Sequence, residues 1–283
     1  MSAPTPIIAL ANQKGGVGKT TTAINLAACL TVQQKRVLLI DLDPQANATS
    51  GLGLQKEETH SIYEVLLGQA SLAEKIQATA YKRLDIVPAE VDLAGAEIDV
   101  ARTDRYLHRF QQAVDPVRCE SRYDFILIDC PPSLGILTMN ALAAADGVTI
   151  PMQCEYYALE GLSVMIGLID RLRKGGANPG LKLEGIIMTM FDGRTNLSRQ
   201  VVSEVRTHFK DRVYDTIIPR SVRLSEAPSF GKPVIDYYPD STGANAYRQL
   251  AAEFIARQQH TAVIDRAPPA SEPEQEMEPA VGE

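Results

Sequence analysis

The chain has 283 residues, of which 45% are hydrophobic and 22% are charged. This composition is typical of a globular protein with one large domain or two small ones. The longest apolar runs are far too short to span a bilayer, and the first residues lack the basic and apolar segments of a secretory signal. The four cysteines form no CxxC pair, so we interpret them as reduced thiols of a cytosolic protein.

The formal charge of −7 argues weakly against nucleic acid binding, but the charge is distributed unevenly. Residues 259–283 carry six acids and one arginine, which leaves 27 basic and 29 acidic residues in the remainder of the chain. Residues 151–258 carry 14 lysines and arginines against 12 acids. The composition is therefore compatible with a local basic patch in the second half.

Short apolar runs alternate with longer amphipathic ones along the chain. The predicted strands cover residues 7–12, 36–41, 84–88, 123–129, 147–151, 183–190 and 213–218. The predicted helices cover residues 19–33, 92–115, 134–145, 158–174, 195–209 and 245–257. Continuous apolar strands separated by helices indicate an α/β fold, with a mostly parallel central sheet flanked by helices on both faces.

No internal repeat or linker interrupts residues 7–258. We therefore expect one domain over 7–258, preceded by a short tail at 1–6. Residues 259–283 are rich in Pro and Glu and lack the apolar side chains that would offset the entropy of ordering. We expect a disordered acidic tail there.

A glycine-rich stretch, KGGVGKT, follows the first predicted strand and opens the first predicted helix, which is the context of a phosphate-binding loop. Position 13 is Gln13 instead of the first glycine of the strict motif, but its second half is intact. Glycines let backbone N–H groups close on phosphate oxygens, and the helix N-terminus adds positive potential. The expected nucleotide contacts are Lys14, Gly15, Gly16, Val17, Gly18, Lys19, Thr20 and Thr21.

Two side chains of this loop carry specific chemical expectations. Lys19 would neutralise the charge of the β- and γ-phosphates, and the Thr20 hydroxyl would bind Mg²⁺. A glycine-rich turn without a ligand is the competing interpretation. It is disfavoured because the residue types, the spacing and the flanking elements agree.

The extra lysine of the loop, Lys14, is explained by a family resemblance. KGGVGKT resembles the deviant Walker A loop of the ParA/MinD ATPases, in which a signature lysine precedes two glycines. In that family this lysine crosses an ATP-dependent dimer and contacts the phosphates bound by the partner. The resemblance implies that Lys19 contacts the phosphates of the ATP bound by its own chain. Lys14 would contact the phosphates of the ATP bound by the neighbouring chain. A solvated lysine at a strand end is the alternative.

Acids stand at the ends of two predicted strands, where ligands collect in parallel α/β sheets. LLIDLD places Asp41 and Asp43 after one strand, and ILID ends another at Asp129 in a Walker B arrangement. The resemblance implies that Asp43 positions the hydrolytic water, and Asp129 would hold the Thr20-bound Mg²⁺ through water. Asp41 is either a supporting contact near the metal or a strand-end turn residue. For Cys130, a packed thiol is favoured over a metal or redox role.

In the second half, MFDGRTNLS and IPRSVRLSEAPSFGKPV closely resemble the chromosomal, Soj-type branch of ParA. The resemblance implies that Pro219 and Arg220 lie by the adenine. It also implies that Glu155 approaches the partner's ribose, for which an ordinary glutamate preceding a helix is the alternative. Arg194 and Arg223 match arginines that bind the DNA backbone without reading sequence, and ordinary surface ion pairs are the alternative.

The resemblance covers nearly all of residues 7–258 and implies a ParA-type ATPase that partitions chromosomes or plasmids. Such a protein binds ATP and Mg²⁺, forms an ATP-dependent homodimer and binds double-stranded DNA non-specifically. Its hydrolysis, weak alone, is stimulated by a ParB-like partner. The residues implied in catalysis are Lys14, Lys19 and Asp43, and the protein is expected to be cytoplasmic and associated with the nucleoid.

Two departures from relatives inform the expected partners. We see no N-terminal helix-turn-helix extension, and no C-terminal membrane helix of the MinD type. The stretch YRQLAAEFIARQQ has an apolar stripe at helical spacing but lacks bulky aromatics and clustered lysines, so we interpret it as a core helix.

The competing functions are a MinD-like membrane-cycling ATPase, a P-loop small-molecule kinase and an iron-protein reductase.

Overall fold

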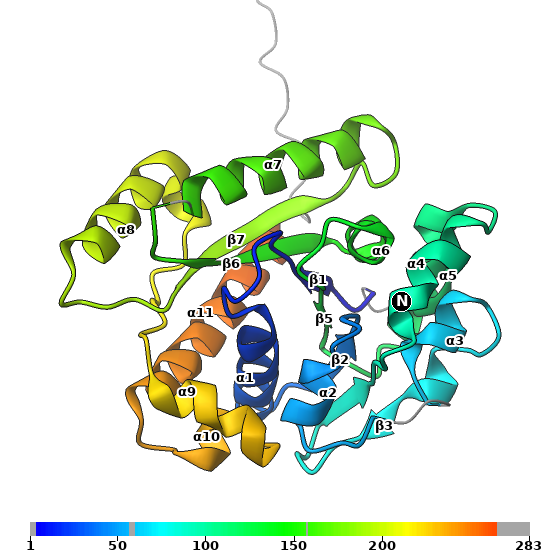
Figure 1. Cartoon of the computed structure of the whole chain (residues 1–283), viewed down its shortest axis with the longest axis horizontal. Coiled ribbons are helices and arrows are strands. Elements are labelled where there is room, and N and C mark those ends of the chain that lie inside the picture. The colour runs from blue at the N-terminus through cyan, green and yellow to red at the C-terminus, as the bar shows by residue number, and fades with distance from the viewer. Residues whose placement is uncertain (1–3, 57–59, 157, 265–283) are drawn as a thin grey trace, which may run out of the picture.

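The computed structural model describes residues 4–56, 60–156 and 158–264. Within these ranges a seven-stranded sheet forms the centre, in the order β3-β4-β2-β5-β1-β6-β7 (Figure 1). Neighbouring strands are parallel except for β3 and β4, which pair antiparallel. The strands are β1 (Ile7–Leu10), β2 (Val37–Asp41), β3 (Gln77–Ala78), β4 (Leu84–Val87), β5 (Phe125–Asp129), β6 (Gly147–Gln153) and β7 (Lys182–Thr189).

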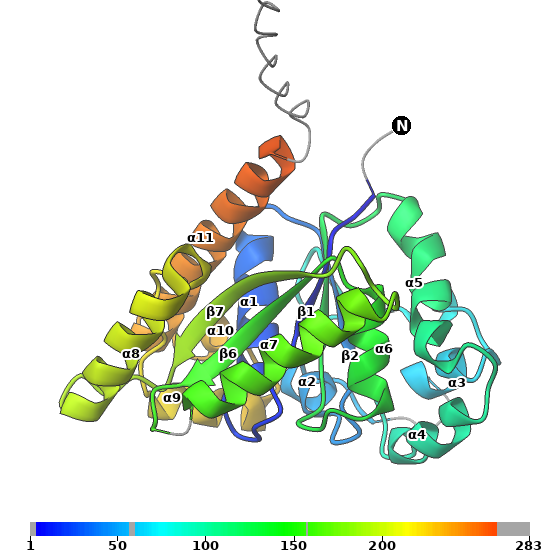
Figure 2. The same cartoon turned by 90° about the horizontal axis from the view of Figure 1, so that it is seen from above.

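Helices cover both faces of the sheet, as Figures 1 and 2 show. The α-helices are α1 (Lys19–Val32), α2 (Asn47–Gly51), α3 (Ile62–Leu66), α4 (Leu93–Ala101), α5 (Arg109–Cys119), α6 (Ile136–Ala144), α7 (Ala158–Lys174), α8 (Asn196–Phe209), α9 (Val222–Glu226), α10 (Val234–Tyr237) and α11 (Thr242–Ile264). The short 3₁₀ turns are η1 (Ala73–Lys75), η2 (Tyr106–His108), η3 (Lys210–Arg212) and η4 (Ala227–Phe230).

Alternate side chains of β1 enter two separate cores. Ile8 and Leu10 pack with α1, α10 and α11, whereas Ile7 and Ala9 pack with α5, α6 and α7. Both faces of the central strands are therefore buried, as their continuous apolar sequence predicts. The expectation of an α/β fold with a mostly parallel sheet is confirmed.

The helix α11 lies against α1 with the apolar stripe that we predicted to be core: Leu250, Ala251 and Phe254 are completely buried. It spans Thr242–Ile264, so it includes residues 259–264 at the start of the expected acidic tail. Residues 1–3 and 265–283, on which the rest of the tail expectations fall, lie outside the described residues. In the described part, no helix combines the length and apolarity needed to cross a membrane.

The prediction of a strand over residues 213–218 is wrong. Within this segment Val213 makes an isolated bridge with Ile186 of β7, and Pro219, just beyond the segment, makes another with Phe191. The seventh strand of the sheet is instead β3. The physical reason lies in α11. The Glu253 carboxylate accepts the backbone N–H groups of Asp215 and Thr216 at 2.8 and 2.9 Å. These two N–H groups are therefore not available for the backbone hydrogen bonds of a continuous β-strand.

The prediction of one helix over residues 92–115 is also wrong in detail. The segment forms α4, the short η2 turn and the start of α5. Arg105, directly before η2, has a φ of 55°, a left-handed conformation that a continuous right-handed helix cannot contain and that a non-glycine residue adopts at a cost.

Candidate nucleotide-binding site

The glycine-rich loop joins the end of β1 to the start of α1, at the carboxyl edge of the sheet. Gly16 and Gly18 have φ values of 74° and 88°, which only glycine adopts readily. The buried side chain of Val17 anchors the loop from inside, and its carbonyl accepts a hydrogen bond of 2.8 Å from the Thr189 hydroxyl. The loop is thereby held against the end of β7.

Lys19, in the first turn of α1, is only 6% exposed. Its ammonium group donates to the Lys14 carbonyl at 3.1 Å. Burial lowers the pKa of Lys19, and the carboxylates of Asp129 and Asp43 act in the opposite direction. A buried cation at the mouth of a loop of backbone N–H groups is suited to a polyanionic ligand, which would compensate its desolvation.

Asp129 lies opposite the loop, where parallel β1 and β5 end together at Leu10 and Asp129. It is completely buried, and neither carboxylate oxygen has a hydrogen-bond partner among the described residues. Burial and the neighbouring Asp41 raise the pKa of Asp129 well above its usual range, while the Thr20 hydroxyl and Lys19 oppose this shift. Such an orphaned carboxylate beside a threonine hydroxyl fits a hydrated Mg²⁺ ion.

Asp41 and Asp43 differ in what their side chains already bind. Both Asp41 oxygens are engaged: one accepts the amide and hydroxyl of Thr49 at 2.8 Å each, and the other accepts the Asp43 amide at 3.2 Å. Burial raises the pKa of Asp41 to about 6. Asp43 accepts one local bond, from the Gln45 amide at 2.9 Å. The geometry therefore favours the turn interpretation of Asp41 and leaves Asp43 acceptor capacity for a ligand.

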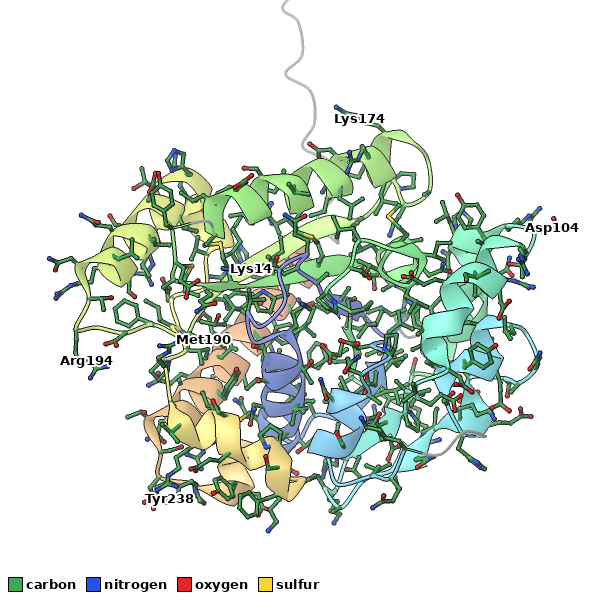
Figure 3. The ribbon with its side chains drawn as sticks, viewed as in Figure 1. Lys14, Asp104, Lys174, Met190, Arg194 and Tyr238 are labelled. Atoms are coloured by element: carbon green, nitrogen blue, oxygen red, sulfur yellow. The ribbon has the colours of Figure 1, made fainter. Side chains whose placement is uncertain are left out.

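Lys14 and Glu155, 141 residues apart in sequence, form an ion pair within this single chain, with 3.1 Å between Nζ and Oε2. The side chains are 39% and 48% exposed, so the pair lies at the surface, and Figure 3 shows Lys14 near the centre of the visible face. The family resemblance implies that each of these two side chains contacts the nucleotide bound by a partner in a dimer. The structure brings their side chains together within one chain.

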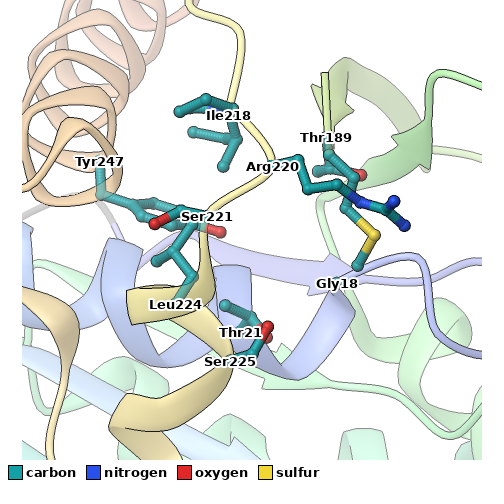
Figure 4. A pocket seen from close by; sticks show the side chains of 11 residues that line it. Gly18, Thr21, Thr189, Ile218, Arg220, Ser221, Leu224, Ser225 and Tyr247 are labelled. Carbon is teal, nitrogen blue, oxygen red and sulfur yellow. The ribbon is translucent and has the colours of Figure 1, made fainter. Parts of the chain in front are cut away.

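A cavity of about 190 Å³ adjoins the loop (Figure 4). Pro219 and Arg220, predicted from sequence, line it, and Figure 4 shows the Arg220 side chain extending toward Thr189, on the side away from Tyr247. Sequence reasoning missed the remaining wall: Thr189, Met190, Ile218, Ser221, Leu224, Ser225 and Tyr247. The Tyr247 hydroxyl shares a hydrogen bond of 3.1 Å with Thr22 of α1. These residues come from three separate segments. Met190 and the residues of 218–225 lie in stretches that carry the family resemblance, whereas Thr189 and Tyr247 have no local signal for nucleotide binding.

Arg194 and Arg223 lie outside this cavity, and each is paired with a carboxylate of its own segment. Arg194 forms a two-pronged ion pair with Asp192, at 2.9 and 2.7 Å, and Figure 3 shows it at the edge of the molecule, far from Lys14. This pair lowers the pKa of Asp192 to about 2. Arg223 contacts Glu226 at 2.8 Å and lies over the Tyr238 ring.

Cys130 follows the orphaned carboxylate in the chain and is completely buried. Burial and the charge of Asp129 raise the pKa of its thiol, so the reactive thiolate form is disfavoured. This environment agrees with the packed-thiol interpretation.

The loop, the buried lysine and the orphaned strand-end carboxylate define the class of P-loop nucleotide-binding proteins. A family model described as an AAA domain matches residues 5–183. The sporulation initiation inhibitor protein Soj of Bacillus subtilis is 54% identical over 251 residues, which are 88% of this chain and 98% of the relative. The chain belongs to the ParA/MinD family of deviant Walker A ATPases, in its chromosomal ParA (Soj-type) branch.

Further comparisons agree with this assignment. The chromosome partitioning protein ParA of Myxococcus xanthus is 55% identical over 252 residues, 89% of this chain and 88% of the relative. A structure of cobyrinic acid a,c-diamide synthase from Mycobacterium smegmatis with bound ADP and magnesium is 36% identical, with a TM-score of 0.78 over 91% of this chain and 96% of that one. The cell division ATPase MinD of Pyrococcus furiosus is 26% identical, with a TM-score of 0.73 over 89% and 98%.

Proposed function

We propose that the chain is a partitioning ATPase that binds ATP and Mg²⁺, dimerises around ATP, and hydrolyses it under the control of a partner. The observation that carries this proposal is the buried, unpaired Asp129 carboxylate beside Thr20 and the buried Lys19. The solved relative that contains ADP and magnesium has the same fold. Burial disfavours the ionised form of Asp129 and raises its pKa, and a bound metal ion would stabilise that ionised form.

The loop residues 14–21 would hold the phosphates of ATP, with Lys19 as the charged contact. Thr20 would bind Mg²⁺ directly, and Asp129 would hold it through water. The metal would neutralise charge on the β- and γ-phosphates. Asp43, which keeps acceptor capacity, would orient the attacking water, while Asp41 shapes the turn that carries Asp43. The cavity beside Pro219 and Arg220 would receive the adenine.

Dimerisation would use the exposed Lys14 and Glu155. In the single chain their side chains form an ion pair with each other. In the dimer, Lys14 would contact the phosphates bound by the partner and Glu155 would approach the partner's ribose. An exposed ion pair is typically worth about 0–1 kcal/mol, so exchanging it for a charge-assisted phosphate contact is favourable.

The dimer would bind double-stranded DNA without sequence preference, through Arg194 and Arg223. Both arginines are at the surface, where phosphate oxygens can replace their present carboxylate partners. A ParB-like protein would stimulate hydrolysis and so release the DNA. Such a protein would act in the cytoplasm, on the nucleoid, in the segregation of a chromosome or plasmid.

A MinD-like function at a membrane is the second candidate, because the chain shares the fold of MinD. One experiment separates the two. The protein is sedimented with random-sequence DNA, and in parallel with anionic liposomes, in the presence of ATP, ADP or no nucleotide. We expect ATP-dependent recovery with DNA alone. Recovery with liposomes alone would support the MinD-like function instead.

A further inference from the structure

A shallow groove of about 450 Å³ runs along α8, on a part of the molecule separate from the nucleotide cavity. Arg199, Val202, Ser203, Arg206 and Thr207 recur at the spacing of one helical stripe and form one wall. Phe191 and Ile217 complete the lining. The groove thus combines two guanidinium groups and two hydroxyls with an apolar floor.

The positive charge of this groove is poorly neutralised within the described residues. No carboxylate belongs to its lining. Arg199 donates to the Asn196 amide oxygen at 3.1 Å. Arg206 donates to the Asp215 carbonyl at 3.0 Å and lies 4.0 Å from the Asp215 carboxylate. Residues 192–215 hold five lysines and arginines and four acids, but none of these acids lines the groove. A negatively charged segment would therefore find a favourable potential along α8.

We propose that the acidic segment at residues 265–283 of this same chain occupies the α8 groove and competes there with DNA phosphates. The competition with DNA rests on the function proposed above, whereas the docking itself does not. The segment carries six acids and one arginine. Four of these acids, Glu272, Glu274, Glu276 and Glu278, fall within seven residues.

The end of α11 places the segment within reach of the groove. Arg257 of α11 donates to the carbonyls of Asp211 and Val213, directly after α8, at 2.9 and 2.7 Å. From Arg257 to Ile264 the helix advances about 10 Å, and from Lys210 back to Arg199 the rise along α8 is about 16 Å. Glu272 is eight residues past Ile264, and an extended chain of that length spans up to about 26 Å.

A second groove, lined by Lys35, Arg118 and Lys182, lies closer to the exit of α11. Asp146 and Glu184 line it as well. Carboxylates in the wall would repel a run of glutamates, since like charges at short range destabilise each other. Charge complementarity therefore selects the α8 groove, whose lining contains none.

The docking test uses the full chain without nucleotide or DNA. The variant E272Q/E274Q/E276Q/E278Q removes four charges, and D92N/D104N/E120Q/D240N removes four exposed charges elsewhere. Backbone amide NMR at low ionic strength should show shifts over the α8 stripe and Ile217 in the first variant only. R199Q/R206Q should abolish the response of α8 to the glutamine changes. An unchanged α8, or shifts gathered around Lys35 and Lys182, would overturn the docking.

The competition test measures affinity for random-sequence duplex DNA with ATP. The tail variant should bind several-fold more tightly than the charge-matched control at low salt, and the difference should shrink as salt increases. Docking without any affinity difference would overturn the competition. If the parent binds no DNA with ATP while the α8 shifts are present, the proposed function fails and the docking stands. Normal ATP-dependent DNA binding with no α8 shifts refutes the docking alone.

Discussion

At the residue scale, the burial and bonding of each charged group suggest distinct roles for residues that look alike in sequence. Lys14 and Lys19 belong to one loop, but Lys19 is buried and Lys14 is exposed and paired with Glu155. Asp41 and Asp43 are two positions apart, but only Asp41 is saturated by hydrogen bonds. Substitutions within each pair should therefore have different effects.

For the lysines, Lys19→Ala should weaken ATP binding by about 1.5–3 kcal/mol, roughly ten- to a hundredfold, because a buried charge-assisted contact is lost. Lys14→Ala should bind ATP like the parent but neither dimerise nor hydrolyse it productively. Titration with a fluorescent ATP analogue and size-exclusion chromatography measure the two effects, with Lys174→Ala as an exposed-lysine control. Equal losses of ATP affinity in both variants would refute the division of labour.

For the acids, Asp43→Ala should retain ATP and Mg²⁺ binding, lose hydrolysis and accumulate as an ATP-bound dimer. Asp41→Ala should instead lose about 1–3 kcal/mol of folding stability, because the Thr49 amide is left buried without its acceptor. ATPase assays with size-exclusion chromatography and thermal unfolding measure the two results. A nucleotide-free, monomeric Asp43→Ala protein would show that Asp43 is structural or a direct metal ligand.

At the scale of elements, the segment between η3 and α9 shows how a distant carboxylate replaces a strand. Glu253 holds the amides of Asp215 and Thr216 and pairs with Arg257 at 2.8 Å. The Asp215 carbonyl in turn accepts a bond from Arg206 of α8. One glutamate of α11 thus fixes the segment that leads to the cavity beside the glycine-rich loop and that supplies Ile217 to the α8 groove.

The variant Glu253→Gln should lower the free energy of unfolding by about 1–3 kcal/mol, since a charge-assisted acceptor of two amides is weakened. The amides and Arg257 lower the pKa of Glu253. Its stabilisation is therefore complete above the ordinary glutamate pKa and disappears as the pH falls through the lowered native pKa. Thermal unfolding across acidic pH checks this, with Glu204→Gln as control. A stability difference that persists below the native pKa would contradict the assignment.

The sequence predicts those parts of the fold and of the site that depend on neighbouring residues, and not those that depend on contacts between distant residues. Strand-end positions such as Asp129 follow from local apolar runs and were predicted correctly, as was the loop that opens α1. The strand over 213–218 was predicted wrongly because its competitor, Glu253, lies about forty residues further on. The Lys14–Glu155 pair and the Tyr247 wall of the cavity join segments far apart in sequence, so no local pattern signals them.

At the scale of the whole molecule, the proposed DNA binding would have to come from local positive charge, since the chain carries a formal charge of −7. Arg194→Glu and Arg223→Glu should each sharply weaken binding to random-sequence DNA with ATP, while ATP-dependent dimerisation persists. Each lost phosphate contact should reduce the log–log salt slope by about 0.9. Filter binding across salt concentrations measures this, with Lys174→Glu as the matched control. Binding equal to the parent's in both variants, or independent of ATP, would refute the mechanism.

The hydrogen bond from Thr189 to the Val17 carbonyl has a thermodynamic consequence. Thr189 ends β7, Met190 lines the cavity beside the loop, and Arg194 follows only four residues later. A ligand that repositions the loop therefore acts on the same short stretch of chain that carries this arginine. Linkage is reciprocal: whatever factor ATP adds to the affinity for DNA, DNA must add to the affinity for ATP. Under the proposed function, a nucleoid surface would then help the protein to retain its bound ATP.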